Sequence, residues 1–193
     1  KTGKSGYSPV CSNEWRPNVC EKPRIKCSDC QFRSFLPVSD QLIINHLAGS
    51  DNTRNQLADF VIGVYPLMQD ERCWFLAVDF DKASWQLDVS AFVAACKDNN
   101  FPYSIEQSRS GKGAHVWLFF STAVFAIEAR KLGSHLLTQA MDEHPELGFE
   151  SYDRLFPNQD TLPKGGFGNL IALPLQKKPR EQGNSVFVDD NFV

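Results

Sequence analysis

Two aspartates that stand two positions apart close the apolar run CWFLAVDFD. A short and nearly continuous apolar run is typical of a buried strand. Because side chains alternate along a strand, we expect Asp79 and Asp81 on one face and Phe80 in the core on the other. Neighbouring carboxylates repel each other, and a hard divalent cation such as Mg²⁺ or Mn²⁺ removes that repulsion. The spacing therefore indicates a metal site, with a turn opened by Asp81 and a lone buried acid at Asp79 as the alternative.

A second group of reactive residue types lies in the stretch SRSGKGAHVWLFF, which begins at Ser108. Its two glycines allow backbone N–H groups to approach an anion, and Lys112 adds positive charge. Ser110 and His115 each offer a hydrogen-bond donor to a phosphate oxygen. The spacing is not that of a P-loop, and a plain hairpin turn with a structural histidine would also explain it. The order of carboxylate strand, helix, strand, turn and histidine strand favours a metal site that faces a triphosphate.

Six cysteines are unevenly distributed along the chain. Cys73 and Cys96 stand in apolar surroundings, which is typical of core residues. The other four crowd the N-terminal part and are Cys11, Cys20, Cys27 and Cys30. No secretion signal is visible, so we expect a reducing, cytoplasmic location, which favours metal binding over disulfides.

The composition fits one sizeable domain with a small appendage. The 193 residues are 42% hydrophobic, which is enough for a real core, and the net charge is −3. Any contact with nucleic acid therefore needs locally clustered basic residues. No apolar stretch is long enough to cross a membrane, and we expect a fragment of a longer protein because the chain starts at Lys1. Residues 1–36 are polar and need a staple such as a metal, while residues 37–193 are expected to form the main domain.

The expected elements mix hairpins with strand–helix units. Ser39 suits the N-cap of a helix that runs to about Leu47, and LDVSAFVAACKDNN has helical spacing. YSIEQS and HVWLFF are predicted strands joined by the glycine-rich turn, followed later by the strands YDRLF, NLIALPL and SVFV. Between them AVFAIEARKLGSHLLTQAMDE is a predicted amphipathic helix with Ile127, Leu132, Leu136 and Met141 on its inner side. The mixed order makes the fold class α+β.

Three segments together carry a resemblance to a known family. LAVDFD, SRSGKGAHVW and YDRLFPNQDTLPKGGFGNLIALPLQKKPR are similar to the archaeo-eukaryotic primase superfamily, the primase-polymerases. The similarity is closest to primase domains of TOTE-type bacterial conflict systems, and it covers the chain from about Gly6 to Asp190. The resemblance implies an RRM-like antiparallel sheet with flanking helices. It also implies template-directed transfer of nucleotides from nucleoside triphosphates by two metal ions, and fused helicase and nuclease domains in the full-length protein.

The resemblance also assigns roles to individual residues. The family's first motif maps to Asp79 and Asp81 as ligands of Mg²⁺ or Mn²⁺. Its second motif, a serine and histidine pair, maps to His115 as a contact to the nucleotide phosphates. Many members have serine at the place of Gly113, so Ser110 or Ser108 must take that role here.

The family's third motif is a single acid, for which Asp153 and Asp160 are the candidates. We favour Asp153, because it falls in a predicted strand that would hold it rigidly, whereas Asp160 falls in a turn-rich loop. The sequence leaves Asp160 open as the alternative.

Two further features bear on partners. The family often carries a zinc knuckle, which Cys11, Cys20, Cys27 and Cys30 would supply here. Cys27 and Cys30 have the spacing of a zinc half-site, although the gap between Cys11 and Cys20 is wide. Free thiols or a disulfide are the alternatives.

The segment QKKPR contains Lys177, Lys178 and Arg180. These residues would hold a phosphate of template or primer, or they would form an exposed polar connection.

The combined hypothesis is a primase-polymerase domain that acts on single-stranded template, primer and nucleoside triphosphates, with catalytic Mg²⁺ or Mn²⁺ and structural Zn²⁺. Two other classes of function fit the same residues. A metal-dependent nuclease would use the same acids without nucleoside triphosphates. A non-catalytic zinc-containing module would bind nucleic acid even without both aspartates.

Overall fold

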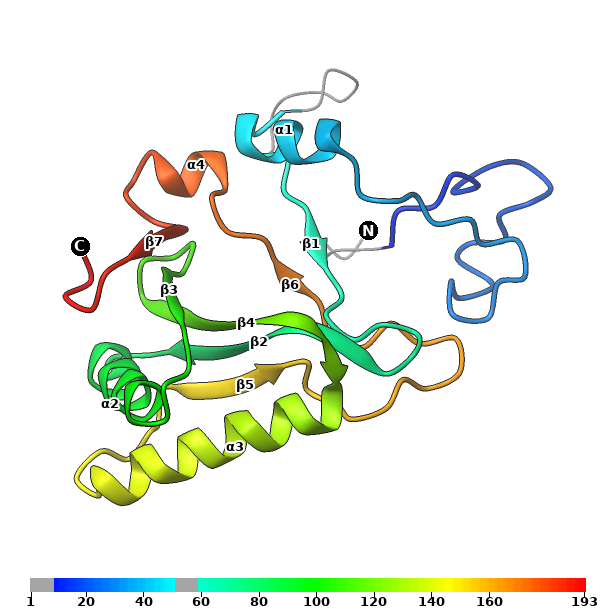
Figure 1. Ribbon diagram of the computed structural model, residues 1–193. Coiled ribbons are helices and arrows are strands. Elements are labelled where there is room, and N and C mark those ends of the chain that lie inside the picture. Colours follow the sequence, from blue (N-terminus) through cyan, green and yellow to red (C-terminus); the bar gives the residue numbers. More distant parts are fainter. Residues whose placement is uncertain (1–8, 51–58) are drawn as a thin grey trace.

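The computed structural model describes residues 9–50 and 59–193, and a five-stranded antiparallel sheet lies at its centre (Figure 1). The strand order is β5-β2-β4-β3-β7. In chain order these strands are β2 (Arg72–Asp81), β3 (Ser104–Gln107), β4 (Gly113–Phe125), β5 (Tyr152–Phe156) and β7 (Val186–Val188). The α+β class with an antiparallel sheet and flanking helices is confirmed.

Two helices, α2 (Trp85–Asp98) and α3 (Ala126–Glu143), cover one face of this sheet (Figure 1). The main core lies between them and the sheet, where Leu76, Val78 and Phe80 of β2 are fully buried. Phe80 packs against Phe92 of α2 with ring centroids 5.7 Å apart. Alternation along β2 thus sends its apolar residues toward the helices, and leaves the intervening residues for the opposite face.

Only part of the inner side predicted for helix α3 is confirmed. Ile127 is 41% exposed and Met141 is 38% exposed, so these two residues do not belong to its inner side. The helix instead approaches the sheet through small residues, and a Cβ atom at Gly133 would lie 2.7 Å from Leu76 Cδ2. Leu136 is buried as predicted, and Leu132 packs against the core as predicted. Close contact between backbone and sheet selects small residues, which a search for large apolar side chains overlooks.

Strand β4 is longer than the predicted strand, because it also takes in residues 121–125. Cys73 pairs with Val124 and Arg72 with Phe125, so the start of β2 extends the ladder beyond Phe120. The guanidinium of Arg72 lies 4.8 Å from the ring centroid of Phe125. Helix α3 therefore begins only at Ala126.

The other face of the sheet carries a small two-stranded sheet of β1 (Gly63–Val64) and β6 (Ile171–Ala172). Ile171 packs there with Ala77, Trp117 and Phe156 in a second apolar cluster. The predicted strand over NLIALPL is thus confined to residues 171–172. Beside it lie the short helices α1 (Asp40–Ala48) and α4 (Lys177–Arg180). Ser39 caps α1 as predicted, since its hydroxyl oxygen accepts the backbone N–H of Leu42.

The cysteine-rich segment, residues 9–36, has no helix or extended strand pairing beyond a single bridge between Cys11 and Phe35. It packs on the loop before β6. Arg33 donates to the carbonyl oxygen of Gly165 at 3.1 Å, and the rings of Phe35 and Phe167 lie 5.3 Å apart. Gly165 has a φ of +77°, and a Cβ atom there would lie 2.3 Å from the carbonyl oxygen of Ser28. These contacts connect the segment to the rest of the chain.

Candidate active site

One row of side chains crosses four neighbouring strands on the face opposite α2 and α3. In the sheet register Glu106 of β3 pairs with His115 of β4, His115 pairs with Asp79 of β2, and Asp79 pairs with Arg154 of β5. Residues that pair directly across antiparallel strands project from the same face. The row therefore places acidic, imidazole, acidic and basic side chains next to one another.

Asp79 and Asp81 project from this same face, as the alternation of β2 predicts, while Phe80 between them is fully buried on the other. Burial raises the pKa of Asp79; the charges of Asp153 and Asp81 raise this pKa further, against the opposing charges of His115 and Arg154. The pKa direction means that the ionised form of Asp79 is disfavoured where it stands. A bound cation would relieve that cost.

The ring of His115 is held between two carboxylates. Its Nδ1 lies 3.0 Å from Oε2 of Glu106, and its Nε2 lies 3.5 Å from Oδ1 of Asp79. Burial by itself would lower the pKa of His115, but the hydrogen bond to Glu106 and the charges of Glu106 and Asp79 outweigh burial and raise this pKa. The site thus favours the charged imidazolium, in which both ring nitrogens carry a proton and can donate a hydrogen bond.

Glu106 is a site residue that the sequence motifs did not identify. Its side chain is 2% exposed, and the same oxygen, Oε2, also accepts the indole N–H of Trp117 at 3.0 Å. A buried carboxylate with two hydrogen bonds is well satisfied. Glu106 therefore connects the histidine to the apolar cluster beneath β1 and β6.

Asp153 lies in an irregular part of β5. Asp79 pairs with Arg154, but Phe80 pairs with Tyr152, so the register shifts and Asp153 is the extra residue. Such a bulge puts two residues of one strand opposite one of its neighbour and redirects a side chain. Asp153 forms an ion pair with Arg154, and its charge acts on the pKa of Asp79.

Asp160, the alternative third acid, lies in the loop after β5 and forms an ion pair with Arg130 of α3. Its charge is not among the causes that shift the pKa of Asp79. Asp153 is thus electrostatically coupled to Asp79, and Asp160 is engaged with the helix that covers the other face.

Buried hydrogen bonds hold the end of β2 at Asp81 in place. The backbone N–H of Asp81 donates to the carbonyl oxygen of Ser151 at 2.7 Å. Ser151 in turn donates from its hydroxyl to Asp88 of α2 at 2.5 Å, and Ser84 donates to the same carboxylate at 3.0 Å. Ser151 and Asp88 are both buried. This network fixes Ser151, the residue just before β5 and two positions before Asp153, against the end of β2.

The glycine-rich turn closes the β3–β4 hairpin beside Asp81. Its backbone is held by a hydrogen bond from Ser108 N to Gly113 O and by another from Gly111 N to Ser108 O, both 2.9 Å. Ser110 Oγ accepts the N–H of Lys112 at 3.2 Å and lies 3.0 Å from Ser108 Oγ. Ser110, Gly111 and Lys112 line one pocket together with Asp81 and Lys82.

Gly113 has a structural reason to be glycine. It pairs with Asp81, and a Cβ atom at this position would lie 2.4 Å from the carbonyl oxygen of Phe80. A serine cannot occupy that place without a shift of β2. The hydroxyl groups near the turn belong instead to Ser108 and Ser110.

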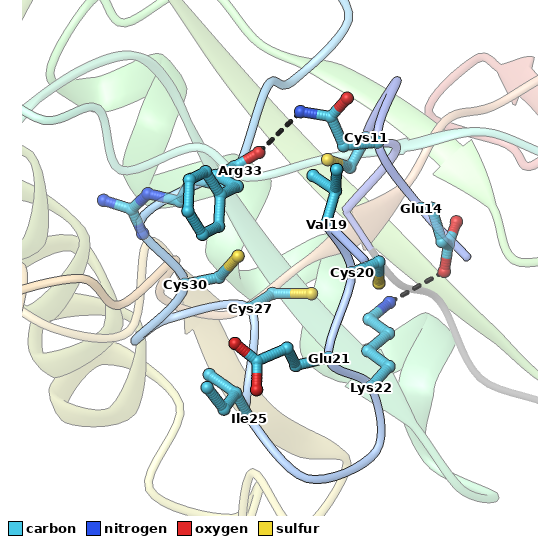
Figure 2. A pocket seen from close by; sticks show the side chains of 12 residues that line it. Cys11, Glu14, Val19, Cys20, Glu21, Lys22, Ile25, Cys27, Cys30 and Arg33 are labelled. Carbon is cyan, nitrogen blue, oxygen red and sulfur yellow. Dashed lines mark hydrogen bonds and ion pairs between the residues drawn. The ribbon is translucent and has the colours of Figure 1, made fainter. Parts of the chain in front are cut away.

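The N-terminal cysteines share a second pocket (Figure 2). Cys11, Cys20, Cys27 and Cys30 all line it as free thiols, while Lys22 on its border forms an ion pair with Glu14 at 2.7 Å. Over residues 9–50 and 59–193, no three side chains of His, Cys, Asp or Glu are grouped closely enough to hold a metal ion. This finding covers the cysteines as well as the three aspartates.

The basic residues of QKKPR all belong to α4. Arg180 donates to the carbonyl oxygen of Leu47 at 2.7 Å and so connects α4 to α1. Lys177 lies 3.6 Å from the carboxylate of Glu181, and the backbone N–H of Lys178 donates to Asp59 at 3.1 Å. These contacts do not involve the row of Glu106, His115 and Asp79.

The comparisons with known proteins identify the family. None of the curated proteins compared with the chain matches it. Among the described residues, no helix combines the length and apolar character needed to cross a membrane. The family model of the TOTE conflict system archaeo-eukaryotic primase domain matches residues 1–193, so the chain belongs to this family of archaeo-eukaryotic primase domains.

Proposed function

We propose that this domain is a primase-polymerase that transfers nucleotides from nucleoside triphosphates to a growing strand under the direction of a single-stranded template. Membership of the primase family supports nucleotidyl transfer in general. The observation that carries the finer proposal is the direct pairing of Asp79 with His115, next to a pocket lined by Asp81, Ser110 and Lys112. This arrangement puts acids suited to metal ions beside donors suited to phosphates.

Asp79, Asp81 and Asp153 would hold two Mg²⁺ or Mn²⁺ ions. The donor set fits in its chemistry, because carboxylate oxygens are the ligands that these hard cations prefer, and because burial disfavours the ionised form of Asp79 in the metal-free site. The three carboxylates would have to draw closer together around the ions, since they are not grouped closely enough to hold a metal as they stand. Asp153 would have to exchange its ion pair with Arg154 for the metal. When bound, the metal ions would activate the 3′-hydroxyl and stabilise the pyrophosphate leaving group.

The residues of the turn and of β4 would bind and orient the triphosphate. Lys112 supplies a positive charge, and Ser110 supplies a hydroxyl at the border of the pocket. His115 would donate a hydrogen bond from Nε2, because Nδ1 is engaged by Glu106. Holding the α-phosphate in line with the 3′-hydroxyl lowers the entropic part of the barrier, which is the main protein contribution in such reactions.

The cysteine-rich segment would bind structural zinc through Cys11, Cys20, Cys27 and Cys30. The shared pocket and the free state of all four thiols support this assignment. A segment with so little regular structure gains order when a metal crosslinks it. The pocket would have to close for tetrahedral coordination, in which Zn–S distances are about 2.3 Å, because the four thiols are not grouped closely enough to hold a metal ion as they stand.

Template or primer phosphates would contact Lys177, Lys178 and Arg180. These residues concentrate positive charge on α4 in a chain whose net charge is −3. Local rather than net charge determines phosphate binding. We further propose that the domain works in the cytoplasm, joined to helicase and nuclease modules of a longer protein.

A primer-extension assay tests the proposed function. The domain is incubated with single-stranded template, labelled nucleotides and Mg²⁺ or Mn²⁺, with and without primer. We expect template-dependent products that disappear in Asp79→Asn and Asp81→Asn variants whose fold is intact. Degradation of the nucleic acid without any need for triphosphates would instead establish a nuclease. Undiminished nucleic-acid binding by both variants, without synthesis or cleavage by the parent, would establish a binding module.

A further inference from the structure

We infer that Glu106 is a positioning residue, which fixes the ring of His115 so that Nε2 faces Asp79 and the bound nucleotide. This inference rests on the proposed function for the identity of the ligand, but the hold of Glu106 on the ring is a property of the protein alone. Neither the acid motif nor the histidine motif includes Glu106. Its position in the sheet and its two hydrogen bonds carry the argument.

The first step concerns the proton on the ring. Oε2 of Glu106 lies 3.0 Å from Nδ1 of His115. An ionised carboxylate only accepts hydrogen bonds, so Nδ1 must carry a proton in this contact. The neutral ring is therefore held as the Nδ1–H tautomer, whereas the charged ring, which the site favours, carries a second proton on Nε2 and can donate it in a hydrogen bond to a phosphate. In general, the hydrogen bond that one ring nitrogen of a histidine makes determines whether the other nitrogen carries a proton.

The second step concerns the orientation of the ring. Glu106 and Asp79 pair with His115 from the strands on either side of β4. Once Nδ1 is directed at Glu106, Nε2 is directed at Asp79, from which it lies 3.5 Å. A rotation of the ring by half a turn would break the contact with Glu106. Glu106 therefore determines that Nε2, rather than a ring carbon, faces the proposed metal and phosphate site.

The third step concerns the rigidity of Glu106 itself. The carboxylate is 2% exposed and also accepts the indole N–H of Trp117, which is itself buried. A buried side chain with two fixed partners cannot move to other positions at low cost. Glu106 is thus held in place by Trp117 of the apolar cluster, and it holds the ring of His115 in a fixed orientation relative to that cluster.

The experiment isolates the contact between Glu106 and His115. Removing Glu106 alone would leave the buried N–H of Trp117 without an acceptor, which would destabilise the fold for an unrelated reason. We therefore compare the double variant Glu106→Leu/Trp117→Phe with the single variant Trp117→Phe. Both lack the indole N–H, so they differ only in the carboxylate that holds His115. Thermal unfolding of both variants establishes that they are folded.

The first measurement needs neither metal nor nucleotide. Two-bond ¹⁵N–¹H correlation spectra report which ring nitrogen carries the proton, and the spectrum of His115→Gln identifies the signals of His115 among the four histidines. Spectra are recorded up to a pH at which the ring is neutral. We expect the Nδ1–H tautomer in the parent and in Trp117→Phe, and a mixture of tautomers in the double variant. The same tautomer in all three proteins would overturn the inference.

The second measurement is the affinity for a nucleoside triphosphate. We expect the Kd of Glu106→Leu/Trp117→Phe to be about 10-fold higher than that of Trp117→Phe, since the contact is a charge-assisted hydrogen bond. Adding His115→Ala to both proteins should abolish the difference, because Glu106 acts through the ring. A difference that survives without His115 would contradict the positioning role. If no protein binds the triphosphate while the tautomers behave as expected, the proposed function fails and the hold of Glu106 on His115 stands.

Discussion

Asp79 on β2 lies directly opposite His115 on β4, and the Oδ1 and Nε2 atoms of these side chains are 3.5 Å apart. The pairing brings together the two sequence motifs, which are 36 positions apart in the chain. It also makes the charge of each group depend on the other, because the ionised aspartate raises the pKa of the histidine and the imidazolium lowers the pKa of the aspartate. The site is therefore one electrostatic unit rather than two separate motifs.

The first prediction follows from the raised pKa of Asp79. A folded-state pKa above the unfolded value means that folding favours the protonated acid. The contribution of protonated Asp79 to the stability of the folded state is fully present below the unfolded pKa of 3.8, and it is lost as the pH rises through the folded pKa. At pH 7 the ionised Asp79 therefore destabilises the metal-free protein. We expect Asp79→Asn to raise its Tm by about 2 °C, measured by calorimetry with chelator present.

Two comparisons check this explanation. The advantage of Asp79→Asn should shrink as the pH falls toward 4, because the parent then becomes protonated at Asp79 as well. Addition of Mg²⁺ or Mn²⁺ should raise the Tm of the parent and leave that of Asp79→Asn nearly unchanged, because the variant lacks a charged ligand. A lower Tm for metal-free Asp79→Asn at pH 7 would contradict the electrostatic account.

The second prediction concerns Gly113. A Cβ atom at this position would lie 2.4 Å from backbone, whereas one at Gly148 would lie 3.3 Å from the flexible side chain of Glu150. We expect Gly113→Ser to lower the free energy of unfolding by about 1–3 kcal/mol, because β2 and β4 must separate locally. Gly148→Ser is the matched control and should change stability little. Equal denaturation midpoints for the two variants would show that the hairpin adapts at no cost.

Local rules of strand and helix structure were sufficient to predict several features of this molecule from its sequence. The two-residue period of β2 places Asp79 and Asp81 on one face and Phe80 in the core. The cap at Ser39 sets the start of α1 at Asp40. Each of these features depends only on neighbours within a few positions in the sequence, so pattern and capping preferences determine it.

Features that depend on how strands pair and how helices pack on the sheet were not predicted. The role of Glu106 depends on the register of β3 with β4, although counting outward from the turn would have paired Glu106 with His115. The bulge at Asp153 arises where β5 meets β2, and nothing in YDRLF signals it. The inner side of α3 depends on how closely the helix approaches Leu76, for which Gly133 matters more than Ile127 or Met141.

The third prediction concerns zinc in the cysteine-rich segment. Elemental analysis of protein purified without chelator should give one Zn²⁺ per chain, and Cys27→Ser should remove most of it, because three remaining thiolates hold the ion less well. Cys96→Ala is the control, since Cys96 is a buried core residue of α2 and lies outside the pocket. Protein without zinc, or a disulfide between Cys11 and Cys20, would refute the zinc assignment.

The fourth prediction separates Asp153 from Asp160 as the third acid. Asp153 acts on the pKa of Asp79, and it lies in a bulge next to Arg154, which pairs with Asp79 in the sheet. Asp160 is engaged by Arg130 of α3. We therefore expect Asp153→Asn to reduce nucleotide addition at least 100-fold, a loss of about 2.7 kcal/mol in transition-state stabilisation. Asp160→Asn should keep most of the activity and should lower the Tm modestly, through the loss of one partly exposed ion pair.

Metal titration distinguishes a ligand from a residue that acts only on the fold. If Asp153 is a ligand, the activity that remains in Asp153→Asn should require a higher Mn²⁺ concentration than that of the parent, because one charged oxygen donor is missing. If Asp153 only balances the charge of Arg154, the metal requirement should be unchanged and Arg154→Gln should restore the activity of Asp153→Asn. A strong loss of activity in Asp160→Asn, with normal activity in Asp153→Asn, would transfer the third-acid role to Asp160. That outcome would require the loop after β5 to leave Arg130 and turn toward Asp79 when metal and nucleotide bind.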